Sequence, residues 1–94
     1  MNKQIQEVMD ILQEECAEVI QMVSKIRRFG LDEMHLKDGE TNRFLLNEEI
    51  GDLMCCIDIL VDNGIINQTD IKIAKGKKIE KLKKWSTIYE QEEN

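Results

Sequence analysis

Apolar residues recur at alternating spacings of four and three along most of this 94-residue sequence, and this spacing constrains the fold more than any other feature. Residues spaced in this way lie on one side of an α-helix. Proline, which interrupts helices, is absent, and Ile, Leu, Glu and Lys dominate. The sequence therefore predicts an all-α protein, a helical bundle with three main helices per chain.

The first expected helix covers residues 3–28 and ends before Gly30, because a cationic last turn followed by glycine is a helix stop signal. Its apolar stripe consists of Ile5, Met9, Leu12, Cys16, Val19, Val23 and Ile26. The second expected helix covers about residues 43–62, and its stripe consists of Leu46, Ile50, Leu53, Ile57 and Leu60. If these helices pack antiparallel, the small residues Ala17 and Gly51 are expected to permit a close approach.

Between these helices, residues 31–41 lack periodicity and are expected to form a loop with at most a short helical turn. Thr41 or Asn42 is expected to cap the second helix. The third helix opens at Asn67 or Thr69, and its apolar residues run from Ile71 to Trp85 and on to Ile88 and Tyr89.

Chain length, net charge and cysteine content narrow the class of protein. Residues 1–94 are expected to form a single domain, and so short a chain buries little core, so a homodimer or homotetramer is expected. The net charge of −6 argues against nucleic-acid binding, and no segment is apolar enough to span a membrane. The odd set of three cysteines, with no CxxC, indicates reduced thiols and a cytoplasmic protein.

Two acidic segments match each other at an offset of 34 residues. Residues 14–20 read EECAEVI and residues 48–54 read EEIGDLM, so each has a double Glu, an apolar residue, a small residue, an acid and two apolar residues. Residues three apart share a helix face, so Glu15 points the same way as Glu18, and Glu49 the same way as Asp52. Two such helices side by side would form two halves of one site.

Four carboxylates at close quarters repel each other, and burying them without partners is expensive. A divalent cation removes that cost, and Mg²⁺ or Mn²⁺ prefers oxygen ligands. Since Mg²⁺ commonly keeps phosphates in its coordination shell, such a site would recruit a phosphorylated ligand. A single ExxE in a Glu-rich helix would indicate only a solvated face, but two aligned copies beside apolar stripes favour a metal site.

The ordered pair EExxE and EExxD, with the second written EEIGDLM, resembles the MazG-like nucleoside triphosphate pyrophosphohydrolases of the all-α NTP pyrophosphatase superfamily. The resemblance covers about residues 7–85. It implies that the metal ligands are Glu15, Glu18, Glu49 and Asp52. It also implies that a nucleoside triphosphate is cleaved to the monophosphate and pyrophosphate. A carboxylate would orient or deprotonate the attacking water, and Glu14 or Glu48 could serve as that base.

Members of this family also carry cationic and amide side chains on the third helix that face the phosphates or the sugar. The resemblance places Lys77, Lys81 and Lys84 in these substrate-binding positions, with Lys81 where the family often has Asn. A lysine-rich helix can also be a solvated face. The nucleobase and the sugar cannot be read from these residues.

Two other functions compete with this interpretation. A non-catalytic helical assembly module would explain the stripes and charged faces but not the matched acidic segments. A related enzyme, such as a phosphoribosyl-ATP pyrophosphohydrolase or a phosphohydrolase of alarmones, would share the acids and differ in base and sugar contacts. A ferritin-like di-iron site is excluded, because neither Glu15 nor Glu49 is followed by His at the third position.

Overall fold

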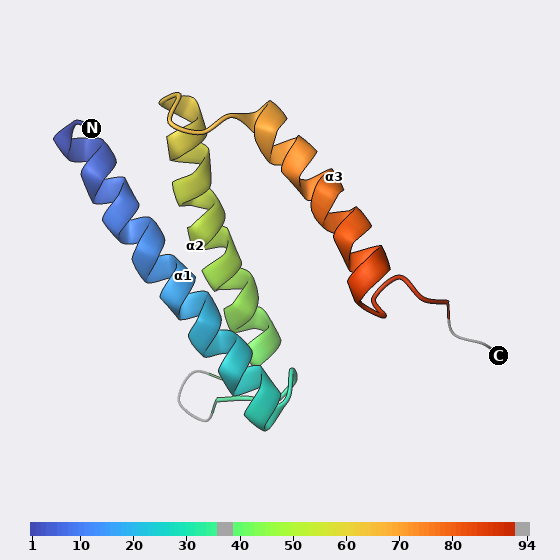
Figure 1. Cartoon of the computed structure of the whole chain (residues 1–94). Coiled ribbons are helices and arrows are strands. Elements are labelled where there is room, and N and C mark those ends of the chain that lie inside the picture. Colours follow the sequence, from blue (N-terminus) through green and yellow to red (C-terminus); the bar gives the residue numbers. More distant parts are fainter. Residues whose placement is uncertain (36–38, 92–94) are drawn as a thin grey trace.

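The computed structural model describes residues 1–35 and 39–91, and these contain three helices and no strand: α1 (Lys3–Phe29), α2 (Asn42–Asp62) and α3 (Gln68–Trp85). α1 and α2 form an antiparallel hairpin, and α3 diverges from α2 at one end of it (Figure 1). The predicted all-α class and the three helices are confirmed. Within the described ranges, none of these helices has the length and apolar character that crossing a bilayer requires.

Each helix begins at a capping side chain that accepts a bond from the backbone N–H three residues on. The three caps are Asn2, Thr41 and Asn67. α3 ends earlier than predicted, at Trp85, so Ile88 and Tyr89 lie outside it. The reason is Ser86, whose backbone is extended and whose hydroxyl donates to the Leu82 carbonyl oxygen at 2.6 Å, which closes the last turn.

The predicted stripes place Ile5 and Leu60 correctly in the contact between α1 and α2, here called the seam, and are displaced by one residue near its middle. Its buried members are Ile5 and Met22 of α1 and Asn42, Cys56 and Leu60 of α2. Cys16, Val23 and Ile50, which the stripes include, are exposed instead. Seven residues nearly complete two helical turns, so positions seven before Met22 and Cys56 also face the seam. Those positions are Glu15 and Glu49, and both are half-buried.

The expectation that Ala17 and Gly51 permit close packing is wrong for this hairpin. Both residues are exposed, and a Cβ atom added to Gly51 would meet nothing within 4 Å. Gly51 lies two residues, or about 200°, beyond Glu49 on α2, so it points away from α1.

A network of hydrogen bonds holds together the described part of the connection between α1 and α2. Asn42 is 1% exposed. Its Nδ2 donates to the Gly30 carbonyl oxygen at 2.9 Å, and its Oδ1 accepts from His35 Nε2 at 2.6 Å. Outside this network, Arg43 donates to both carboxylate oxygens of Asp32, at 3.0 and 3.1 Å, and this bond lowers the pKa of Asp32. These bonds fix the start of α2 against the end of α1.

Asn42→Ala should destabilise the protein by about 1–3 kcal/mol, because the Gly30 carbonyl and the His35 ring would lose a buried partner. Urea unfolding followed by circular dichroism measures this change. Asn47→Ala is the matched control, since Asn47 lies on the same helix and is exposed. Equal stability of the two variants would show that the network does not hold the connection.

α3 does not complete a compact bundle within the single chain. α1 and α2 are the pair of helices that pack against each other, while α3 has no buried residue among those described. The Cα radius of gyration is 16.9 Å, whereas a compact domain of this length has one of about 13 Å. The predicted bundle is therefore present as a two-helix hairpin with a third helix beside it.

Candidate metal centre

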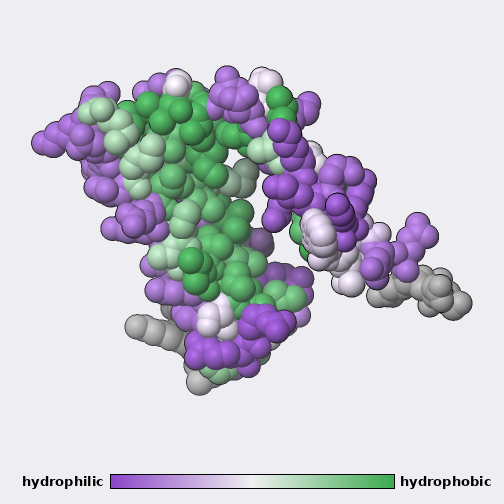
Figure 2. All heavy atoms as spheres, in the orientation of Figure 1, coloured by the Kyte–Doolittle hydropathy of each residue, from purple (hydrophilic) through white to green (hydrophobic). Residues whose placement is uncertain are grey.

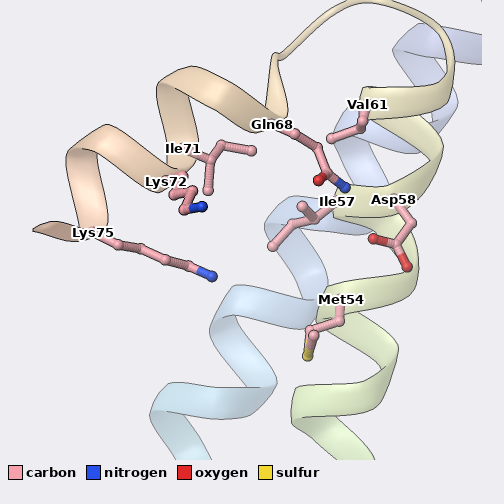
Figure 3. Close-up of a pocket in the computed structure, with 8 residues that line it drawn as sticks. All are labelled: Met54, Ile57, Asp58, Val61, Gln68, Ile71, Lys72 and Lys75. Carbon is pink, nitrogen blue, oxygen red and sulfur yellow. The ribbon is translucent and has the colours of Figure 1, made fainter.

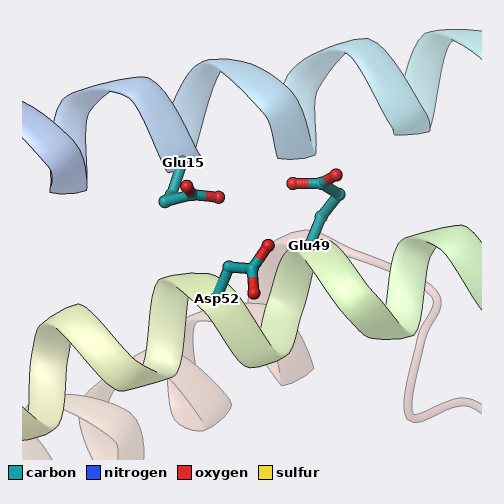
Figure 4. A group of neighbouring side chains, drawn as sticks. All are labelled: Glu15, Glu49 and Asp52. Carbon is teal, nitrogen blue, oxygen red and sulfur yellow. The ribbon is translucent and has the colours of Figure 1, made fainter.

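Three carboxylates from two helices converge in the middle of the seam. One carboxylate oxygen from each of Glu15, Glu49 and Asp52 lies within 4.8 Å of the others. Figure 4 shows Glu15 pointing from α1 toward α2, and Glu49 and Asp52 pointing back from α2. The spacing of three residues places the two α2 side chains on neighbouring positions of one face, as the sequence predicted.

Burial makes this group unusual. Glu15 and Glu49 interrupt a line of apolar contacts, and Glu15 Oε2 is buried with no hydrogen-bond partner among the described residues. A buried charged oxygen that lacks a donor is costly. Asp52 is exposed, so the group of three carboxylates is half-buried at Glu15 and Glu49 and open to solvent at Asp52.

The electrostatics of Glu49 reflect this crowding. Burial raises the pKa of Glu49 above its ordinary value, and the negative charges of Glu18, Glu15 and Asp52 raise it further. Because the pKa of an acid rises when its charged form is disfavoured, a positive charge beside Glu49 would be stabilising.

Glu18 is close to this group without belonging to it. Its side chain is exposed, yet its charge is the second-largest cause of the raised pKa of Glu49, after burial. The structure therefore brings together three of the four predicted ligands, with the fourth close enough to interact. Glu14 and Glu48, predicted as alternative general bases, are exposed and lie outside the converging group.

The predicted substrate-binding lysines lie elsewhere. Lys77, Lys81 and Lys84 are exposed on α3, and no ion pair joins them to the hairpin in the part of the chain that the structure describes. Lys84 instead lies over the ring of Trp85, 5.0 Å from its centroid. Within one chain, the acids and these lysines do not form a common site.

The apolar stripes did not predict that Glu15 and Glu49 are half-buried in the seam. Glu15 precedes Met22 and Glu49 precedes Cys56 by seven residues, but this interval identifies a seam position only once the structure shows that Met22 and Cys56 are buried. The stripes passed through Cys16 and Ile50, one position further along each helix, because those residues are apolar. Apolar character alone therefore misplaced the centre of the seam by one residue.

The donor set fits a hard divalent cation. All three converging groups offer carboxylate oxygens, which are the ligands that Mg²⁺ and Mn²⁺ prefer. The unpartnered Glu15 Oε2 and the raised pKa of Glu49 both indicate a deficit of positive charge at this point. An exposed acid at the open side, Asp52, leaves room for water or phosphate in the remaining positions.

Comparison with known proteins adds no relative: no family model, no curated protein and no solved structure matches the chain.

The raised pKa of Glu49 gives metal-free protein a defined dependence on pH. The folded chain holds the Glu49 proton more tightly than the unfolded chain. The resulting stability is fully present below the ordinary glutamate pKa and is lost as the pH rises through the raised pKa. Glu49→Gln should therefore raise the melting temperature by a few degrees at pH 7 in EDTA. Between pH 4 and 7, the melting temperature of this variant should fall less than that of the wild type.

Thermal unfolding by circular dichroism with and without Mg²⁺ measures both effects. Mg²⁺ should raise the melting temperature of the wild type and leave that of Glu49→Gln nearly unchanged. Glu7→Gln, an exposed acid on α1, is the control and should behave as the wild type. A Glu49→Gln variant less stable than the wild type at pH 7 in EDTA would contradict the expected charge repulsion.

Proposed function

We propose that this chain is a metal-dependent nucleoside triphosphate pyrophosphohydrolase, similar to the MazG-like enzymes, that cleaves (d)NTP to (d)NMP and pyrophosphate. The observation that carries the proposal is the convergence of Glu15, Glu49 and Asp52 around a buried carboxylate oxygen without a partner. A helix pair selected only for packing would place apolar residues at these seam positions. The two aligned acidic segments in the sequence support the same proposal.

The acids of the seam would hold the cation, and Glu18 at the edge would add to the negative field that attracts it. Bound Mg²⁺ or Mn²⁺ would supply positive charge next to the phosphates and lower the pKa of a water molecule. Glu15 and Glu49 would be held rigidly by the packed helices, so the reacting phosphate would be fixed relative to the chain.

The attacking water requires a carboxylate to orient it and accept its proton. Glu14 and Glu48 each lie one residue before a seam acid, outside the converging group, and are exposed to solvent. Either one could receive the proton and release it to bulk water. The cationic side chains of Lys77, Lys81 and Lys84 would bind the phosphates once α3 of a second copy, or of the same chain, reaches them.

We also propose that the enzyme acts in the cytoplasm as a homodimer or homotetramer. Within one chain the acids and the three lysines of α3 do not form a common site, so a neighbouring copy would bring the lysines to the acids. The three cysteines are free, with Cys56 buried in the seam, and reduced thiols suit a reducing compartment.

Hydrolysis of a panel of NTPs and dNTPs with Mg²⁺ or Mn²⁺ tests the proposal, with products identified by chromatography. Monophosphate and pyrophosphate are expected. Glu15→Gln and Glu49→Gln should each lower kcat/KM roughly 10²-fold or more, a loss typical of removing a charged group that positions the reaction. Glu7→Gln should retain wild-type activity.

Two results would contradict the proposal. Diphosphate and inorganic phosphate would place the cleavage at a different bond. Inactivity toward every nucleotide, with phosphoribosyl-ATP included in the panel, would favour a non-catalytic assembly module. Activity toward phosphoribosyl-ATP alone would keep the metal chemistry and change the substrate.

A further inference from the structure

α2 and α3 run in opposite directions and diverge with distance from the connection that joins them (Figure 1). Residues 63–67 form this connection. Two helices joined by so short a loop commonly pack against each other as a hairpin. α3 has no buried residue among those described, although a helix in water owes most of its stability to the packing of one face. α3 therefore requires a surface to pack against.

An apolar groove lies between the two helices beside the connection. Its volume is about 700 Å³, and its walls include Met54, Ile57 and Val61 of α2 and Ile71 of α3. In Figure 3, Ile57 and Ile71 extend toward each other from the two helices. Removing such apolar walls from water is favourable, so the groove favours a closer approach of the two helices.

The apolar positions of both walls continue beyond the groove. On α2 the next position is Ile50, four residues before Met54, and on α3 the next positions are Ile79 and Leu82, eight and eleven residues after Ile71. These spacings keep each set on one side of its helix. Ile50 is 37% exposed and Ile79 is 39% exposed. Figure 2 shows the hydrophobic band of the hairpin uncovered on the side turned to the viewer. Two matching stripes therefore face each other in the groove and separate beyond it.

The charged side chains of the groove are opposite in sign on its two walls. Asp58 lies on the α2 wall, and Lys72 and Lys75 lie on the α3 wall. A closer approach of the helices therefore brings unlike charges together within the groove. Because an exposed ion pair contributes little by itself, the burial of the apolar stripes would provide the driving force.

The connection contains one point about which α3 can turn. The backbone N–H groups of Gly64 and Ile65 donate to carbonyl oxygens in the last turn of α2, at 3.0 and 2.9 Å. Asn67 Oδ1 accepts from the backbone N–H of Asp70 at 3.0 Å and so belongs to α3. The step from Ile66 to Asn67 lies between these two sets of bonds. Rotation about its backbone bonds changes the angle between the helices and leaves both sets intact.

We propose that α3 is a lid that closes onto α2 by turning at Ile66 and Asn67, so that Ile79 and Leu82 pack against Ile50 and the groove is filled. The occupant of the groove is α3 of the same chain, because the two stripes already face each other at the end nearest the connection and continue with matching spacing. Closure requires neither a metal ion nor catalysis.

Closure keeps the predicted substrate-binding lysines accessible. Lys72 and Lys75 lie within about 100° of Ile71 around α3, whereas Lys77 and Lys84 lie about 240° and 220° from it. The second pair would therefore remain on the outer side of the closed helix. Their role toward phosphates rests on the proposed function, whereas the closure of α3 does not.

The first test needs no variant and uses nuclear Overhauser effects between isoleucine methyl groups in ¹³C-methyl-labelled protein. An effect between Ile50 and Ile79 is expected, because these residues come together only when α3 closes. The measurement is repeated after the labelled chain is unfolded and refolded with a large excess of unlabelled chain. An effect within one chain keeps its intensity per labelled chain, whereas an effect between two copies disappears.

The second test measures hydrogen exchange of the α3 amides by mass spectrometry. Ile79→Asp should raise their exchange rates roughly tenfold or more, because a charge would replace a side chain buried by closure. Ile73→Asp is the matched control, since Ile73 is an exposed isoleucine on the outer side of α3 and its exchange should match the wild type. The amides of α1 and α2 report in the same experiment that each variant has folded.

Three results would overturn the closure of α3. The first is the absence of an effect between Ile50 and Ile79. The second is an effect that disappears on dilution with unlabelled chain, which would mean that a second copy fills the groove. The third is an equal rise in α3 exchange for Ile73→Asp and Ile79→Asp. Nucleotide hydrolysis is measured separately, so failure of the lid and failure of the proposed activity give different results.

Discussion

The structure depends on the contact between α1 and α2, in which two carboxylates occupy positions that packing alone would assign to apolar residues. Glu15 and Glu49 lie at the same heptad positions as the buried Met22 and Cys56. Their burial raises the pKa of Glu49 and leaves one oxygen of Glu15 without a partner. A positive charge in the seam would relieve this repulsion, and the proposed function rests on that argument.

The sequence predicted the helices well because the signals that start and stop a helix are local. The caps Thr41 and Asn67 and the glycine after α1 act within a few residues of the helix ends they define. α3 was predicted too long because Ile88 and Tyr89 continued its apolar spacing. The hydroxyl of Ser86, which satisfies the Leu82 carbonyl, ends the helix against that pattern.

The sequence predicted which acids form the candidate site, but it did not predict which of them are buried in the seam. The matched segments identified the acids, and the spacing of three residues placed Glu49 beside Asp52. Which acid enters the seam depends on the rotation of each helix about its axis, and contacts distributed along the hairpin fix that rotation. The position of α3 could not be predicted either, because its exposed isoleucines and lysines give no indication of which chain they contact.

The charge deficit in the seam bears on folding as well as on the proposed function. A cation held by Glu15 and Glu49 would bind the folded hairpin and not the unfolded chain, because only folding brings these two side chains together. Its binding would shift the folding equilibrium toward the folded chain by mass action. A chain with so small a core would therefore gain stability from the proposed ligand, and the arrangement of acids need not be the most stable packing of the hairpin alone.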